Sequence, residues 1–184
     1  MAEDNIYQIN KKIIYKSKLD EKICLQAVDL INKIQSNFTD KSWDCPIRTS
    51  LNTTYNILNI IGLFDLKMHI LSKVNLFMYE NNNICDGYLS DSWVNIYEKN
   101  FFQEYHTHIS NVDKFICGVV YLTDNNSQIH FNLGPEISPK FGDILIFNDD
   151  DMHRVLPNEK DDLRISLAFN YKKCREWKGI KIEK

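Results

Sequence analysis

Residues 142–171 read GDILIFNDDDMHRVLPNEKDDLRISLAFNY, and this stretch decides the fold. It begins with a short apolar run, Ile144–Phe147, and ends with an alternating run, Arg164–Tyr171, which is typical of a strand. Between the two runs lie a turn rich in aspartate and a histidine, His153. The stretch therefore predicts two β-strands whose connection carries a histidine.

Three further runs of β-type residues precede this stretch. Phe115–Leu122 is rich in β-branched and aromatic residues, and Trp93–Tyr97 and Ile129–Leu133 alternate between apolar and polar side chains. Turns that contain Gly, Pro, Asn or Asp separate these runs. Several short strands at such spacing predict a β-sandwich or barrel.

The first eighty residues mostly show the apolar spacing of helices. Apolar residues recur every three or four positions in 20–34 and again in 51–79, which we expect to be split near Gly62. A short β-like run at 12–15 precedes them, and 40–50 is expected to be a loop. Helices followed by strands predict an α+β layout in which the helices cover one face of the sheet.

The composition is that of an ordinary soluble protein, with 43% hydrophobic and 26% charged residues. The length suits a single domain over residues 1–184, with 1–80 as mainly helical support. A net charge of -3 with scattered basic residues predicts no strong nucleic-acid binding. Five cysteines without C-x-x-C spacing, and no signal peptide, predict reduced thiols and a cytoplasmic location. The longest apolar stretch, near 57–64, is too short to span a membrane.

Three of the five histidines occupy positions that suit one metal ion. His106 and His108 are two residues apart, so in extended backbone both rings point to the same side. Barrel topology can bring His153, which follows a distant strand, beside them. Imidazole binds iron, zinc, copper and nickel, so these ligands alone do not select the metal. The alternative for the His106 and His108 pair is two hydrogen-bonded strand histidines.

Two pairs of polar side chains could complete a binding site. Arg164 and Ser166 share one strand face, where a guanidinium and a hydroxyl can hold a carboxylate together. Asn95 and Tyr97 share the face of another strand. Together with the histidines, these side chains can enclose a small keto acid.

These motifs resemble the 2-oxoglutarate- and iron(II)-dependent oxygenase superfamily, and within it the small oxygenases of phages and bacteria that are related to prolyl hydroxylases. The resemblance covers residues 91–171. It rests on the segments Trp93–Tyr97, His106–His108, Gly118–Leu122, Gly142–Phe147, His153–Pro157 and Arg164–Asn170. It implies a double-stranded β-helix (jelly-roll) core with the N-terminal helices packed on one sheet.

The resemblance also implies roles and cofactors. Iron(II) would be the metal and 2-oxoglutarate the cosubstrate. With dioxygen, they would hydroxylate a protein side chain or a small molecule and release succinate and CO2, in the host cytoplasm if the protein is phage-encoded. His106 and His153 would bind the metal, and Arg164 and Ser166 the far carboxylate of 2-oxoglutarate. Tyr97, Asn95 and Tyr121 would line the cosubstrate pocket.

One position departs from the superfamily pattern. A carboxylate usually follows the first histidine by two residues and completes a triad of two histidines and one carboxylate. Here that residue is His108. Either His108 is itself a ligand, or Asp113 supplies the carboxylate instead. In a third possibility, water, an anion or a different metal accounts for the change.

A cupin is the competing interpretation. Its motifs would place His106, His108, Asp113 and His153 around the metal on the same kind of β-helix, acting as an enzyme without 2-oxoglutarate or as a non-catalytic binding module. It leaves the pair of Arg164 and Ser166 without a role.

Three other features have structural explanations. We expect Trp93 to pack the sheet on the helices, His130 to be a plain sheet-face histidine, and Asp149–Asp151 to be a solvated turn.

Overall fold

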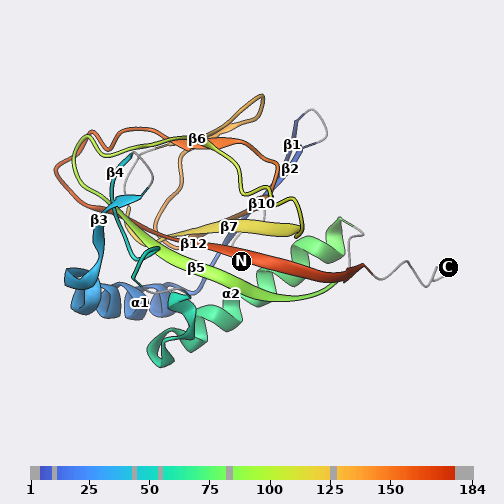
Figure 1. Ribbon diagram of the computed structural model, residues 1–184, viewed down its shortest axis with the longest axis horizontal. Helices are drawn as coiled ribbons and strands as arrows, with labels where there is room; N and C mark the ends of the chain where they lie inside the picture. Colours follow the sequence, from blue (N-terminus) through green and yellow to red (C-terminus); the bar gives the residue numbers. More distant parts are fainter. Residues whose placement is uncertain are drawn as a thin grey trace, which may run out of the picture.

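The described residues form two β-sheets that face each other, with two α-helices beside the larger sheet (Figure 1). This computed structural model describes residues 5–9, 12–42, 45–53, 56–81, 85–124 and 128–176. The strands of the larger sheet are β1 (Asn5–Ile9), β2 (Lys12–Lys18), β3 (Thr39–Ser42), β4 (Cys45–Thr49), β5 (Cys85–Tyr97), β7 (Phe115–Tyr121), β10 (Asp143–Asn148) and β12 (Arg164–Glu176). Those of the smaller sheet are β6 (Gln103–His106), β8 (Ile129–Phe131), β9 (Glu136–Ile137) and β11 (His153–Val155).

The strand order is that of a jelly roll. Within the described residues, the larger sheet runs β1-β2-β10-β7-β12-β5-β4-β3 and the smaller sheet runs β6-β11-β8-β9. Each strand pairing is antiparallel. Strands that are distant in the sequence therefore lie side by side. The α+β fold class with helices on one sheet is confirmed.

The helices cover the face of the larger sheet that points away from the smaller sheet (Figure 1). Helix α1 (Glu21–Ile34) begins after Asp20, whose carboxylate accepts a hydrogen bond from the Ile23 amide at 3.1 Å. Helix α2 (Phe64–Glu80) follows two 3-10 turns, and Gly62 lies in the second of them. The helix expected over 51–79 was therefore wrong in its first part, because among the described residues the α-helix begins only at Phe64 and two 3-10 turns stand before it.

The first eighty residues contribute more β-structure than their sequence indicates. The run at 12–15 is part of β2, and β1 pairs with β2 at one edge of the larger sheet. The expectation of a loop over 40–50 was wrong, because β3 and β4 occupy most of that stretch; residues 43 and 44 lie outside the described part. These strands depend on pairing with distant partners such as β5, which local spacing does not reveal.

Strand β5 shows how the sequence separates the two faces of the larger sheet. Val94 and Ile96 are fully buried in the core beneath the helices. Their neighbours Trp93, Asn95 and Tyr97 point to the opposite side and line a cavity between the two sheets. The period-two alternation thus puts apolar residues toward the helices and functional candidates toward the second sheet.

Gly118 on β7 lies where the backbone and a ring leave no room for a side chain. A Cβ at this position would stand 2.6 Å from the Leu145 carbonyl oxygen and closer still to the Phe169 ring. We expect Gly118→Ala to lower the free energy of unfolding by about 1–3 kcal/mol, because the closely packed core must shift. Urea unfolding measures this. Gly62→Ala is the control, since its Cβ would meet only the flexible end of Leu30, and an equal loss there would contradict the explanation.

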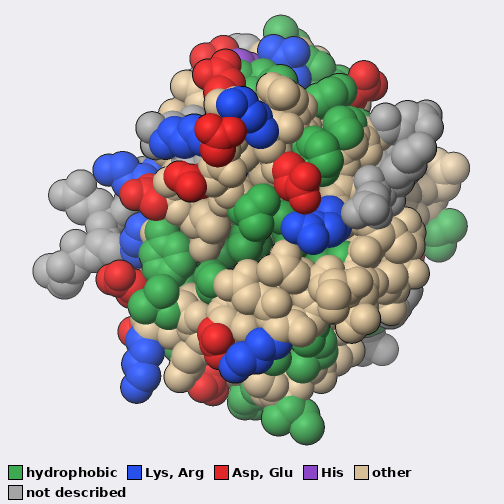
Figure 2. Space-filling view, turned by 90° about the vertical axis from the view of Figure 1, so that its left-hand side faces the viewer, with side chains coloured by type: hydrophobic (Ala, Val, Ile, Leu, Met, Phe, Trp, Pro, Cys, Tyr) green, Lys and Arg blue, Asp and Glu red, His purple; other side chains and the backbone are tan. Residues whose placement is uncertain are grey.

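Two surface observations bear on possible partners. On the end of the molecule shown in Figure 2, the described acidic and basic side chains are interspersed and form no stripe of one sign. Across the described residues, the helices are too short or too polar to cross a bilayer. The absence of strong nucleic-acid binding and the single-domain organisation stay predictions.

Candidate metal and cosubstrate site

The three candidate histidines meet at one point between the sheets. His106 ends β6 and His153 begins β11, and these two residues are direct partners in the register of the smaller sheet. His108 lies two residues past the end of β6. One ligand atom from each of the three lies within 4.8 Å of the others, close enough to serve one ion.

Each imidazole is held by a hydrogen bond on its Nδ1 atom. The His106 Nδ1 bonds the Glu104 carbonyl oxygen at 2.9 Å, and the His153 Nδ1 bonds the Asp151 carbonyl oxygen at 2.8 Å. The His108 Nδ1 bonds the side-chain oxygen of Asn170 on β12 at 2.8 Å. Because these oxygens accept, each ring carries its proton on Nδ1 and presents a lone pair on Nε2. Metal-binding histidines are oriented in this way.

Burial lowers the pKa of all three imidazoles. For His108, desolvation and the neighbouring His106 ring lower the pKa to about 4, although the Asn170 hydrogen bond opposes this. The pKa of His153 is well below its usual value because of burial and then of His106 and His108, and that of His106 is lowered mainly by burial. The rings are therefore neutral at pH 7, the state in which imidazole binds a metal.

These lowered pKa values make the metal-free protein sensitive to acid. Below about pH 6.5 the unfolded chain takes up protons on these histidines, whereas the folded protein holds the rings neutral. The free energy of unfolding should therefore fall as the pH drops from about 6.5 toward 4, the folded-state value for His108. Urea unfolding at about pH 7, 6 and 5 measures this. His153→Asn should show a smaller decrease, and an equal decrease in this variant would contradict the assignment.

The aspartates before His153 support the site, and the expectation of a solvated turn was wrong for two of them. Asp149 and Asp151 are buried, and only Asp150 is exposed. The Asp149 carbonyl oxygen accepts the His108 amide at 2.9 Å, and its carboxylate accepts the Phe115 amide at 3.1 Å. These bonds attach the loop that carries His108 to the turn before β11.

Two other titratable candidates lie apart from the three imidazoles. Asp113 forms an ion pair with Lys172, with 2.8 Å between its carboxylate oxygen and the lysine Nζ, and it is not among the residues grouped around the candidate ion. His130 lies on β8 beside Glu136 and Arg154, so it is a sheet-face histidine. Both lie in the part of the chain that the structure describes.

The cosubstrate candidates line the same cavity as the histidines. This cavity is lined by Asn95, Tyr97, Tyr121, Arg164 and Ser166 as well as by the three histidines. Strands β5 and β12 place them opposite one another, with Arg164 facing Tyr97 and Ser166 facing Asn95 in the register. Tyr121 is the register partner of Ser166 on the other side, on β7. All five side chains predicted from the sequence therefore surround one space.

Among the described residues, no carboxylate forms an ion pair with the buried cation Arg164. Arg164 is 2% exposed, and its Nε and Nη1 atoms have no hydrogen-bond partner among the described residues. Its guanidinium lies between two rings, 5.2 Å from the centroid of Tyr97 and 5.3 Å from that of Tyr121. Burying an unpaired charge is costly, so this position favours an anionic ligand with two acceptor atoms.

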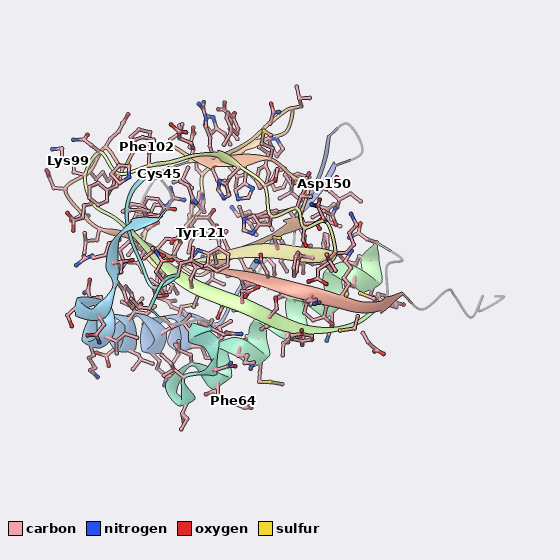
Figure 3. All side chains as sticks on the ribbon, in the orientation of Figure 1. Cys45, Phe64, Lys99, Phe102, Tyr121 and Asp150 are labelled. Atoms are coloured by element: carbon pink, nitrogen blue, oxygen red, sulfur yellow. The ribbon has the colours of Figure 1, made fainter. Side chains whose placement is uncertain are left out.

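Apolar side chains pack at the arginine end of the cavity. Tyr97 packs there in an apolar cluster with Cys45, Ile47 and Val155, and Cys45 and Phe102 lie at that end of the two-sheet layer in Figure 3. Burial raises the pKa of Tyr121 to about 12, although the charge of Arg164 opposes this. Tyr121 is therefore a neutral hydroxyl that can donate a hydrogen bond.

Sequence reasoning missed three residues of the site. Trp93 does not pack the sheet on the helices, as we expected; it lines the cavity and stacks on His108, with ring centroids 5.8 Å apart. Gln103 accepts the Tyr97 hydroxyl at 3.1 Å, and Asn170 orients His108. The alternation of β5 and β12 could have found Trp93 and Asn170, since they continue the faces of Asn95 and Ser166.

The donor set fits a divalent transition metal. Three neutral imidazoles with oriented rings suit iron, zinc, copper or nickel. The described residues supply no carboxylate to the group, which leaves any bound ion more positive than in a site with two histidines and one carboxylate. In the same cavity, the Arg164 guanidinium has two nitrogens without a partner among the described residues, and it independently fits the far carboxylate of a dicarboxylic acid.

By sequence alone, no family model and no curated protein matches the chain. Solved structures do match. The viral collagen prolyl hydroxylase of Paramecium bursaria Chlorella virus-1, in complex with 2OG, has a TM-score of 0.66 at 16% identity, over 88% of this chain and 96% of that one. The Pseudomonas putida prolyl-4-hydroxylase has a TM-score of 0.65 at 15% identity, over 88% and 92%.

A protein of another activity has the same architecture. The α-ketoglutarate-dependent epimerase SnoN of nogalamycin biosynthesis has a TM-score of 0.69 at 12% identity, over 86% of this chain and 76% of that one. The chain has the fold of the 2-oxoglutarate- and iron(II)-dependent oxygenases. The jelly-roll core expected from the resemblance is confirmed. Because identities this low show the fold alone, the activity must be argued from the site.

Proposed function

We propose that the protein is an iron(II)- and 2-oxoglutarate-dependent oxygenase. The observation that carries the proposal is the buried guanidinium of Arg164, whose Nε and Nη1 have no hydrogen-bond partner among the described residues, in the same cavity as three oriented imidazoles. A metal-binding module without a cosubstrate gives Arg164 no role. A dicarboxylic keto acid gives it one, because one end of the acid can reach the metal while the other pairs with the guanidinium.

In this proposal His106, His108 and His153 hold the metal, and Arg164 and Ser166 bind the far carboxylate of 2-oxoglutarate. Tyr97 and Tyr121 flank the guanidinium and keep it desolvated, which strengthens its ion pair with the acid. Asn95, fixed by the Thr49 hydroxyl at 2.9 Å, lies opposite Ser166 and lines the cosubstrate. When bound, iron(II) supplies the redox chemistry that activates dioxygen.

The overall reaction inserts one oxygen atom of dioxygen into a C–H bond of a protein side chain or a small molecule. The second oxygen atom enters succinate, and CO2 leaves. The C–H bond and the keto acid each give up two electrons, which together reduce dioxygen. Val119, Val155 and Ala168 are the apolar walls that limit water in this space.

Turnover of 2-oxoglutarate tests the proposal. Protein supplied with iron(II), 2-oxoglutarate and dioxygen should release succinate and CO2 in equal amounts, slowly even without a substrate. Omission of any one component should stop the release. An iron-dependent oxidation whose rate does not depend on 2-oxoglutarate would instead favour the cupin interpretation. The cluster of His106, His108 and His153 is also compatible with a cupin.

The third ligand can be examined through His108→Asp. If His108 binds the metal, a carboxylate at this position should keep or raise iron affinity, since it adds a negative charge to two neutral ligands. His108→Ala should weaken metal binding by more than about a hundredfold, because the loss of a partner that only orients a ligand already costs about ten- to a hundredfold. Equilibrium dialysis with elemental analysis measures both. A loss of binding in His108→Asp as large as in His108→Ala would contradict the role of this position.

A further inference from the structure

A second pocket adjoins the metal site on the side away from Arg164. It shares Trp93 and His108 with the inner cavity. Leu51 and Ile109 form apolar walls, and the polar groups of Asp91 and Asn170 complete it. We call it the outer pocket. A molecule bound there lies directly beside a candidate metal ligand, which is where a substrate must be.

The register of β5 and β12 sets the order of groups along the site. From one end to the other, the facing pairs are Arg164 with Tyr97, Ser166 with Asn95, Ala168 with Trp93, and Asn170 with Asp91. Asn170 holds His108. The cosubstrate end and Asp91 are therefore at opposite ends of one ladder, and the histidines lie between them.

Asp91 is the charged group of the outer pocket. Its carboxylate is half-buried and accepts a hydrogen bond from the Ser90 hydroxyl at 2.8 Å. Among the described residues, no lysine or arginine forms an ion pair with it, whereas the nearby Asp113 is paired with Lys172. A half-buried carboxylate with no ion-pair partner among the described residues favours a cationic ligand.

Trp93 adds a second preference for a cation. It projects from the same face of β5 as Asp91, two residues further along, and it lines the outer pocket. The indole ring attracts ammonium groups through its π-electrons. Leu51 and the exposed Ile109 offer contact to an aliphatic chain but no hydrogen bond from their side chains.

We propose that the outer pocket selects a substrate with an alkylammonium group. The ammonium pairs with Asp91 beside Trp93, and the aliphatic carbons lie along Leu51 and Ile109 toward His108. This inference rests on the proposed oxygenase function. The reaction replaces one C–H bond of the aliphatic chain with C–OH, and the C–H bond and 2-oxoglutarate each give two electrons to dioxygen. The ammonium keeps its proton. Both a free amine and a lysine side chain offer this group.

Proton relaxation on the manganese-loaded protein tests the inference. The 184-residue protein with Mn²⁺ and 2-oxoglutarate, kept without dioxygen, is titrated with n-pentylamine and with its neutral counterpart 1-pentanol. Manganese relaxes the protons of any molecule bound near it. We expect the relaxation rate of the n-pentylamine protons to rise on binding. We also expect n-pentylamine to bind about tenfold more tightly than 1-pentanol. The acetylated methylamides of lysine and norleucine form a second pair, which distinguishes a peptide side chain from a free amine.

The variants identify the group responsible. Asp91→Asn keeps the shape of the side chain and should weaken n-pentylamine binding by about tenfold, with no change for 1-pentanol. Asp150→Asn removes the same charge from an exposed position, labelled in Figure 3, and should leave both unchanged. Thermal unfolding and the relaxation of 2-oxoglutarate protons should match the wild type in both variants.

The outcomes separate the two proposals. If 2-oxoglutarate is relaxed by manganese but n-pentylamine binds no better than 1-pentanol, the alkylammonium inference is wrong and the oxygenase proposal stands. An equal loss of n-pentylamine affinity in Asp91→Asn and Asp150→Asn also overturns the inference, since it indicates that the amine responds to the overall surface charge rather than to Asp91. If 2-oxoglutarate itself is not relaxed, the oxygenase proposal fails, and the inference that rests on it fails too.

Discussion

Replacing Arg164 with alanine should weaken 2-oxoglutarate binding by about a hundredfold or more and leave metal affinity nearly unchanged. Removing one partner of a buried charge pair costs about 2–5 kcal/mol, largely because the other charge is left unpaired. Arg164 is 2% exposed and has no other described anion to bind. The imidazoles do not depend on it, since their Nδ1 atoms are held by Glu104, Asp151 and Asn170.

Isothermal titration of 2-oxoglutarate into the metal-loaded protein measures this effect. Arg154→Ala is the matched control, because Arg154 alternates with the cavity-lining His153 and Val155 and packs over the Tyr105 ring at 4.8 Å. It removes the same charge from the opposite face of the smaller sheet. A similar loss in both variants, or parallel loss of metal in Arg164→Ala, would contradict the role of Arg164.

Replacing His153 with alanine should reduce metal affinity by more than about a hundredfold. Loss of a partner that only orients a ligand costs about ten- to a hundredfold, so loss of a ligand should cost more. His153 is 3% exposed and its ring centroid lies 4.3 Å from that of His106 and 5.4 Å from that of His108. No other described residue belongs to the group around the candidate ion.

Equilibrium dialysis against iron(II) or cobalt(II), followed by elemental analysis, measures the loss. His130→Ala serves as the control, since His130 lies on the adjacent strand and bonds Gln128. Circular dichroism should show that both variants are folded. If His153→Ala retains the metal, or if His130→Ala loses as much metal as His153→Ala, the three histidines do not form the metal site.

Much of the site could be predicted because two-residue periodicity is independent of the rest of the fold. It placed Arg164 with Ser166 and Asn95 with Tyr97, and all four line the cavity. It did not tell which side of β5 faces the helices. Both sides of that strand are buried, one under the helices and one under the second sheet, so Trp93 could be assigned to the wrong side.

Other features depend on contacts that no local pattern contains. Asp149 and Asp151 contact His108 and His153 through backbone carbonyl oxygens, which every residue has, so these two contacts could not be predicted from the side chains. Strands β3 and β4 form where β5 offers an edge for pairing. Such strands are specified by distant partners rather than by their own spacing.

The most direct test of the account is an anaerobic titration of the iron(II)-loaded protein with 2-oxoglutarate, followed by visible absorption. If the imidazoles hold iron and Arg164 holds the far end of the keto acid, chelation should produce a metal-to-ligand charge-transfer band that saturates at about one equivalent per chain and is lost in Arg164→Ala at the same concentration. An iron-loaded protein that shows no band at saturating 2-oxoglutarate would contradict the account.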